Sequence, residues 1–185
     1  ARVQVDVRVG DILTAINGML TRDAQDMSEL MRNTAGQQVL LQYERGGASK
    51  RVVVIPVDAR REEDLRYTDW THSRRDMVER AGGGRLGYLH LRAMGGGDMA
   101  SFVREFYAQF DRDGLIIDVR RNRGGNIDSW IIEKLLRRAW AFWSRPDGLP
   151  YTNMQQTFRG HLVVLTDALT YSDGETFAAG VKALK

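Results

Sequence analysis

The sequence has 185 residues, enough for one domain or two small ones. Apolar residues make up 43% and charged residues 28%, and the formal net charge of +3 is too small to indicate nucleic acid binding. The chain has no cysteine, which excludes disulfides, thiolate catalysis and cysteine-based metal sites. No apolar run approaches the roughly 20 residues of a membrane helix, so we expect neither a nucleic acid nor a membrane partner.

Both ends of the chain are expected to be cut from a longer protein. The first residue is not Met, the sequence begins almost directly in a strand pattern, and residues 181–185 have the pattern of the middle of a helix. No signal-peptide pattern opens the chain. The absence of cysteine is compatible with either the cytoplasm or the periplasm, so the compartment stays open.

Residues 1–57 are predicted to form one β-rich unit. Valine alternates with polar residues at the start, a period of two that indicates a strand. Asn17-Gly18 and Gly46-Gly47 are typical turn dipeptides. The predicted elements, in chain order, are a strand over 2–9, an apolar segment over 12–16, a short helix over 26–32, and a hairpin of two strands over 39–43 and 51–55.

Residues 58–82 are highly charged and predict a linker that leads into an exposed helix. Residues 83–185 then alternate apolar strand patterns with amphipathic helix patterns, which predicts an α/β domain with a parallel sheet. The predicted elements of this part are strands over 86–91, 115–119 and 162–166, and helices over 99–110, 127–143 and from 173 onward. Ligands of such folds bind near the carboxyl ends of the strands.

Two loops of interest follow such strand ends. Ser172 stands between a buried strand and a helix, beside the free N–H groups and the positive end of the helix dipole. Gly124-Gly125 follows the strand over 115–119, with Asp118 and Asn122 in place to brace the turn through side-chain to backbone hydrogen bonds. A nucleophile near backbone donors is what acyl transfer needs, so the two loops suggest a serine hydrolase.

Each of these features also has a purely structural interpretation. Residues 172–175 read S-x-x-E, a capping box in which Ser172 caps the helix and Glu175 returns the hydrogen bond. Gly124-Gly125 can be a tight turn that needs positive φ. The histidines His72, His90 and His161 are widely separated, and no metal-binding pattern occurs, so we expect no metal and no cofactor.

The first unit resembles a PDZ domain of the bacterial protease type. The resemblance rests on residues 9–18, V-G-D-I-L-T-A-I-N-G, followed by the short helix and the closing hairpin, and it covers most of residues 7–57. PDZ domains bind extended peptides by adding a strand to a sheet edge. The loop that binds the peptide carboxylate would lie upstream of residue 1. A small β-rich adaptor that never binds peptide is the alternative.

The second half resembles the tricorn and C-terminal-processing serine peptidases. Residues 118–125, D-V-R-R-N-R-G-G, are similar to the family signature D-x-R-x-N-x-G-G. Residues 83–89, G-G-R-L-G-Y-L, and 171–177, Y-S-D-G-E-T-F, resemble the first strand and the serine motif of the family. The order of a PDZ domain before a catalytic domain also matches, so the resemblance spans nearly the whole chain.

The resemblance implies a fold, a mechanism and a set of roles. The fold would be a crotonase/ClpP-like α/β spiral over 83–185, preceded by the PDZ-like domain over 1–57 and the charged linker over 58–82. Ser172 would be the nucleophile, with an oxyanion hole formed by the N–H of Asp173 and that of either Gly124 or Gly125. Full tricorn-like proteins assemble into large oligomers, so the resemblance implies a homo-oligomer.

In the tricorn branch the activating histidine precedes the PDZ domain, and a supporting Glu follows the nucleophile by several dozen residues; neither region is in this chain. In the other branch a lysine is the base, but Lys182 and Lys185 follow Ser172 too closely to reach its hydroxyl. We therefore expect the 185 residues alone to be inactive.

The leading hypothesis is a serine endopeptidase that hydrolyses peptides or unfolded proteins through an acyl-enzyme on Ser172. A non-catalytic peptide-binding or assembly module that keeps the fold is the first alternative. A crotonase/ClpP-like enzyme acting on a thioester is the second, and the PDZ-like unit argues against it.

Overall fold

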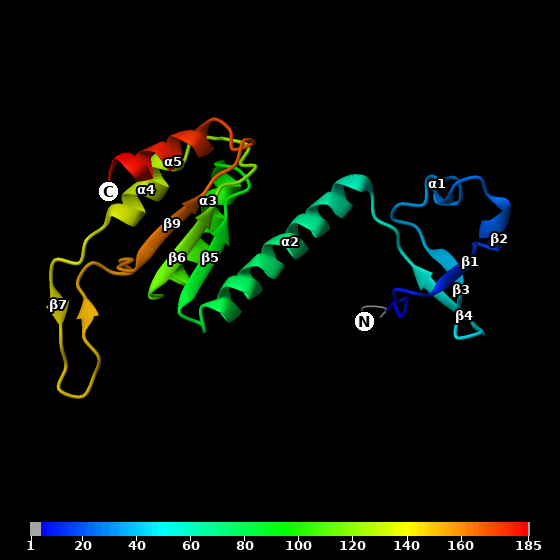
Figure 1. Cartoon of the computed structure of the whole chain (residues 1–185), viewed down its shortest axis with the longest axis horizontal. Coiled ribbons are helices and arrows are strands. Elements are labelled where there is room, and N and C mark those ends of the chain that lie inside the picture. The colour runs from blue at the N-terminus through cyan, green and yellow to red at the C-terminus, as the bar shows by residue number, and fades with distance from the viewer. Residues whose placement is uncertain (1–4, 185) are drawn as a thin grey trace. The chain divides into compact units, whose positions relative to one another are not determined.

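The computed structural model describes residues 5–184 and divides the chain into two compact units, residues 1–67 and 68–185 (Figure 1). As predicted, a β-rich unit precedes an α/β unit with a parallel sheet. The long helix α2, Ala59–Ala81, crosses the division between the two units. The domain boundaries expected from the sequence, at residues 57 and 82, stay a prediction.

The first unit is a four-stranded antiparallel sheet with the order β2-β1-β3-β4. Its elements are β1 (Ile12–Ile16), β2 (Met19–Leu20), a 3-10 turn (Thr21–Asp23), α1 (Met27–Leu30), β3 (Val39–Arg45) and β4 (Ala48–Val54). A small core forms where Ile16, Leu30 and Val39 are buried together.

The strand predicted over 2–9 is wrong where it can be checked. Residues 5–8 have no regular structure and residues 9–10 form a turn, while the first part of the predicted strand, residues 2–4, lies outside the described residues. Val5, Val7 and Val9 are exposed. A period of two favours a strand only where one face of the strand is covered by other residues. In the described residues nothing covers these valines, so no strand forms here.

The second unit contains a three-stranded parallel sheet with the order β5-β6-β9. Its strands are β5 (Leu86–His90), β6 (Gly114–Asp118) and β9 (His161–Leu165), and its helices after α2 are α3 (Gly96–Tyr107), α4 (Asp128–Leu136) and α5 (Asp173–Ala183). Each strand is paired in register with its neighbour, so the loops after β6 and β9 leave the same edge of the sheet.

One face of this sheet carries the main core. Leu89, Leu115 and Ile117 point to that face and are almost fully buried. Three helices contribute to the same cluster, through Phe102 and Phe106 of α3, Ile131 of α4 and Phe177 of α5. Burying an aromatic or aliphatic side chain of this size contributes about 1.5–3 kcal/mol each. This core fixes the helix that follows Ser172 against the sheet.

The helix predicted over 127–143 is too long. The helix α4 ends at Leu136, and the chain then forms a two-stranded hairpin of β7 (Phe142–Trp143) and β8 (Tyr151–Thr152). Aromatic residues favour strands as well as helix faces, and the turn dipeptides around Pro146 and Gly148 close the hairpin. Trp140, Phe142 and Trp143 are 57–70% exposed, so of the two interpretations that their pattern allows, a core and a subunit contact, the core is excluded.

Candidate active site

Ser172 has an unusual backbone conformation. It stands at the N-cap of α5 with φ 54° and ψ −118°, in a loop that follows the buried strand β9, and its side chain is exposed. Positive φ is uncommon for a residue with a Cβ, and a sparsely populated conformation costs about 1–3 kcal/mol. Such strain is concentrated at functional sites, where the surrounding structure holds the residue in place. The sharp strand-to-helix turn that carries a nucleophilic serine is one example.

The capping box predicted for this helix is only half formed in the hydrogen bonds around Ser172. The Ser172 N–H donates to Oε2 of Glu175 at 2.6 Å. The Glu175 N–H donates to the main-chain oxygen of Ser172 at 2.9 Å, and no cap hydrogen bond reaches the Ser172 side chain. Backbone and carboxylate therefore satisfy the cap, and Oγ is left for other partners.

Gly124 lies directly against the serine. A Cβ built on Gly124 would be 2.8 Å from Cβ of Ser172 and 3.2 Å from its Oγ, and Gly124 has φ +77°. A Cβ on Gly125 would be only 1.9 Å from the main-chain oxygen of Met94. Both positions therefore need glycine because other atoms approach them closely, and the loops after β6 and β9 meet at Gly124 and Ser172.

The backbone donors around the serine are not equivalent. The Gly124 N–H donates to Oδ1 of Asn122 at 2.8 Å, which confirms that Asn122 braces the turn. Within residues 5–184, the N–H groups of Gly125 and Asp173 have no hydrogen-bond acceptor. An exposed N–H at a helix N-terminus attracts negative charge. Asp173 and Gly125 thus offer free donors, and Gly124 does not.

Asn122 ties three segments together from a position that is 1% exposed. Its Nδ2 donates to the main-chain oxygen of Leu91, after β5, at 2.7 Å, and its own main-chain oxygen accepts the Tyr171 N–H at 3.0 Å. A Cβ on Gly174 would meet the Asn122 side chain at 2.9 Å. The loop that carries Ser172 is therefore seated on Asn122.

The Asp173 side chain has a structural role that the sequence did not reveal. Its Oδ2 accepts the N–H of Ile127 at 2.9 Å and that of Asp128 at 3.1 Å, at the start of α4. A carboxylate there satisfies two free N–H groups and complements the helix dipole. Asp173 thus caps α4 with its side chain while its backbone begins α5, which fixes the two helix N-termini relative to each other.

Asp167 is a second residue that sequence reasoning missed. Its Oδ1 accepts the N–H of Arg121 at 2.9 Å and the N–H of Leu169 at 3.0 Å. These backbone hydrogen bonds, the one from Arg121 first, hold the pKa of Asp167 below its ordinary value. Aspartate is a frequent turn residue, so its position two residues after an apolar strand is the feature of the sequence that could have predicted this role.

Asp118 anchors the other face of the sheet from a fully buried position. Its Oδ2 accepts hydrogen bonds from the Tyr88 hydroxyl at 2.8 Å and from Nη2 of Arg120 at 2.6 Å, and its Oδ1 accepts the Arg120 N–H at 3.0 Å. Burial alone would raise the pKa of Asp118, but the hydrogen bonds from Arg120 and Tyr88 outweigh burial and lower it. The Arg120 turn is therefore braced, as predicted for Asp118.

No general base for Ser172 is evident among the residues that the structure describes. No hydrogen bond joins Ser172 to a histidine there. His90 packs its ring against Trp70 at 5.0 Å, its Nε2 lies 2.9 Å from the Arg120 main-chain oxygen, and burial lowers its pKa. His161 begins β9, about 13 Å before the strand's end at about 3.3 Å per residue. Lys182 is ten residues further along α5, about 15 Å by helix rise.

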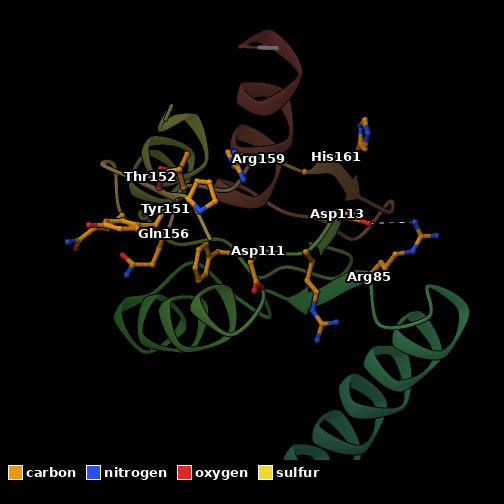
Figure 2. Close-up of a pocket in the computed structure, with 14 residues that line it drawn as sticks. Arg85, Asp111, Asp113, Tyr151, Thr152, Gln156, Arg159 and His161 are labelled. Atoms are coloured by element: carbon orange, nitrogen blue, oxygen red, sulfur yellow. Dashed lines mark ion pairs between the residues drawn. The ribbon is translucent and has the colours of Figure 1, made fainter. Parts of the chain in front are cut away.

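A large cavity lies at the opposite end of the sheet from these loops. It has a volume of about 880 Å³ and is lined by residues that precede or begin the parallel strands, among them Arg85, Asp113 and His161, and by residues of β8 and the loop after it. Figure 2 shows their side chains, with the ion pair between Arg85 and Asp113 at 3.5 Å. Because the serine follows the carboxyl ends of the strands, this cavity is not where its substrate would bind.

Over the described range 5–184, no group of three or more His, Asp or Glu side chains is placed to hold a metal ion. The helices in that range include none that is both long and apolar enough to cross a membrane.

Two known families match the chain, and they follow one another in the same order as the two structural units. Residues 85–185 match the model of peptidase family S41, and residues 1–59 match the model of the tricorn protease PDZ domain. A PDZ domain followed by an α/β peptidase domain, the fold predicted from the sequence, is thereby confirmed.

Comparison with individual proteins points the same way. Tricorn protease homolog 1 of Streptomyces coelicolor is 37% identical over 97% of this chain, and tricorn protease of Thermoplasma volcanium is 27% identical over 97%. The alignment covers 17% of each of those proteins. A crystal structure of the tricorn protease superposes on 95% of this chain with a TM-score of 0.81 and 26% identity, and 17% of that chain is covered.

Proposed function

The chain belongs to peptidase family S41, and we propose that it carries the nucleophile and oxyanion hole of a serine endopeptidase. The observation that carries the proposal is the position of Ser172, which is held in a strained conformation with its hydroxyl free of the cap and with two unpaired N–H groups beside it. A serine that only capped α5 would need neither the strain nor the close approach of Gly124.

In the proposed reaction, Oγ of Ser172 attacks the carbonyl carbon of a peptide bond while a general base takes the hydroxyl proton. The oxyanion that forms accepts hydrogen bonds from the N–H groups of Asp173 and Gly125. The base returns the proton to the leaving amine, and water hydrolyses the acyl-enzyme on Ser172. The base comes from outside residues 5–184, where no residue is placed for the role.

Gly125 rather than Gly124 is the second oxyanion donor in this proposal. The Gly124 N–H already donates to Asn122, whereas the Gly125 N–H has no acceptor within the described part of the chain. Removing one such donor typically lowers the rate by about 10²–10³-fold. Gly124 then has a steric role, since any side chain there would press on Ser172.

The proposed substrates are peptides or unfolded proteins, and the proposed assembly is a homo-oligomer. An active-site strand edge and a PDZ domain both accept an extended backbone, which folded proteins seldom expose. Exposed aromatic side chains gather on the hairpin of β7 and β8 and just before it, where Trp143 is 57% and Trp140 70% exposed. Exposed apolar patches of this kind are typical of subunit contacts.

The test is covalent labelling of the full-length protein with a fluorophosphonate, with the modified residue located by peptide mass spectrometry. We expect the label on Ser172, none in Ser172→Ala, and unchanged labelling in Ser49→Ala, a control that removes an exposed hydroxyl from the first unit. Folded protein that stays unlabelled at Ser172 would overturn the proposal and favour a non-catalytic peptide-binding or assembly module.

A further inference from the structure

A second pocket lies between helices α3 and α4, and its lining shares no residue with the two loops around Ser172. Its volume is about 310 Å³, at the lower end of the range for small-ligand pockets. Phe106 and Tyr107 of α3 and Trp130 of α4 form aromatic walls. The pocket is open to solvent at its rim, where Tyr107 is 44% and Trp130 61% exposed.

Lys134 lines this pocket with a buried ammonium group. The residue is only 9% exposed, and its Nζ has no hydrogen-bond partner in the described structure. Its nearest recorded partners are ring faces, with the centroid of Tyr107 at 4.7 Å and that of Phe106 at 5.6 Å. Cation–π contacts recover only about 0.5–2 kcal/mol, whereas an ammonium taken out of water without an acceptor costs several kcal/mol.

The charge around the pocket favours an anion. Lys134 and Arg137 are positive and Glu133 is negative, and no other charged side chain lines the pocket. Glu133 and Arg137 stand at the rim, where an Nη2 to Oε1 distance of 3.9 Å pairs them loosely, and the Glu133 side chain is 73% exposed. Glu133 is therefore turned to water, and the buried positive charge of Lys134 is left uncompensated.

We propose that this pocket binds the carboxylate of a peptide, with the adjacent apolar side chain packed on the aromatic walls. An ammonium donates up to three hydrogen bonds and pairs strongly with a carboxylate. A phosphate carries up to two charges and has no apolar part, whereas this pocket offers one buried charge between apolar walls, which suits a singly charged carboxylate next to an apolar group. The carboxylate can be that of a peptide C-terminus or of an acidic side chain, because both present the same two oxygens.

The test is calorimetric titration of the full-length protein with three probes. N-acetylphenylalanine carries a C-terminal carboxylate, N-acetylglutamic acid amide carries only a side-chain carboxylate, and N-acetylphenylalanine amide carries none. We expect at least one acid to bind about tenfold or more tighter than the neutral amide, the difference that one charge-assisted hydrogen bond contributes. The tighter acid identifies the source of the carboxylate.

Lys134→Met tests the residue, since methionine fills the same space without charge. We expect about tenfold or greater loss of binding of the acid probe, with no loss of thermal stability, because the unpaired buried charge is gone. Lys50→Met, which removes an exposed ammonium from β4, should bind like the unaltered protein. Trp130 is exposed, so Trp130→Ala should leave the core folded, and it should weaken the binding of the acid probe severalfold.

Equal affinity for acid and amide, no binding of either, or undiminished binding in Lys134→Met would overturn the proposal. The inference is independent of the reaction at Ser172. Fluorophosphonate labelling of Ser172 should be the same in Lys134→Met as in the unaltered protein, so failure of the carboxylate site and failure of the proposed peptidase function give different results.

Discussion

The Ser172 hydroxyl does not contribute to the stability of α5 in the way that its position suggests. At an ordinary N-cap the serine Oγ accepts a main-chain N–H, and its loss costs about 0.5–2 kcal/mol. Here Glu175 and the Ser172 main-chain oxygen take over those contacts. The backbone strain at φ 54° is therefore not compensated by the cap and has to be offset by the packing of the rest of the helix.

A pair of variants at Ser172 separates the two roles of the residue. Ser172→Ala keeps the strain and loses only Oγ, so we expect its free energy of unfolding to stay within about 0.5 kcal/mol of the unaltered protein. Ser172→Gly relieves the strain, and we expect it to be more stable than Ser172→Ala by about 1 kcal/mol after the larger chain entropy of glycine is subtracted.

Both Ser172 variants should lose all fluorophosphonate labelling, and the thermal unfolding of the two proteins gives the comparison of stability. If the unfolding temperature of Ser172→Ala is instead several degrees below that of both Ser172→Gly and the unaltered protein, the hydroxyl acts as a cap. In that case the strain argument for a nucleophile no longer holds.

At the scale of elements, the site depends on how α4 and α5 are joined. The side chain of Asp173 accepts two N–H groups at the start of α4, and Phe177 anchors α5 in the core shared with Ile131. The Asp173 N–H, the proposed oxyanion donor, is thus held in place by the hydrogen bonds that the side chain of the same residue accepts from α4. A shift of α4 would move the backbone on which Ser172 depends.

Asp173→Ala tests this connection. We expect a loss of about 1 kcal/mol in stability, the usual effect of removing a helix cap, with faster hydrogen exchange at Ile127 and Asp128. The rate of labelling at Ser172 should also fall, although the Asp173 N–H is still present. Asp173→Asn keeps an acceptor oxygen and should show smaller changes in both. Unaltered exchange at the start of α4 in Asp173→Ala would contradict the capping role.

The parallel strands could be predicted because apolar runs bounded by glycine and charge leave few alternatives. The double role of Asp173 could not, since it arises from Ile127 and Asp128 coming close to it in space. The pattern S-x-x-E encodes a cap and a nucleophile turn alike, and only the φ of Ser172 separates them. The end of α4 was missed because aromatic residues at helical spacing also suit an exposed hairpin.

In the first unit, Asp11 links the turn before β1 to β3. Its carboxylate accepts hydrogen bonds from Nε and Nη2 of Arg45, both at 2.7 Å, and from the N–H of Arg8 at 2.8 Å. The hydrogen bond from Arg45, followed by that from Arg8, lowers the pKa of Asp11 from 3.8 to about 2. The folded protein therefore holds Asp11 ionised at a pH where the unfolded chain has begun to protonate it.

The pH dependence of Asp11→Asn follows from the sign of that shift. Because the folded pKa is lowered, the contribution of Asp11 to stability is fully present above the unfolded pKa, about 3.9, and is lost as the pH falls to about 2. The variant should therefore unfold at a lower temperature than the unaltered protein at pH 7, and the difference should shrink between about pH 4 and pH 2.

The measurement is thermal unfolding of the first unit at several pH values. Asp23→Asn is the matched control, because Asp23 is exposed and its ion pair with Arg22 at 3.7 Å contributes little. A difference between Asp11→Asn and the unaltered protein that is constant from pH 7 to pH 2 would mean that the charge of Asp11 has no part in its effect.

At the scale of the whole molecule, the nucleophile and its activating groups are expected to come from different parts of the protein. The chain spans about 17% of the length of the relatives described above. Within residues 5–184, His90 is held by Trp70 and the Arg120 turn, and His161 is at the far end of β9. In the proposed mechanism the loops thus present a serine and two oxyanion donors that still lack a base.

We therefore expect these 185 residues, produced alone, to show neither peptide hydrolysis nor labelling of Ser172 above background, whereas the full-length protein shows both. A general base contributes about 10²–10⁴-fold to the rate, so the oxyanion hole alone leaves the serine slow. Circular dichroism must show that the isolated chain is folded, since an unfolded chain would be inactive for a different reason. Hydrolysis that needs Ser172 in the isolated chain would place the base among its own residues, and His90→Gln and His161→Gln would then identify it.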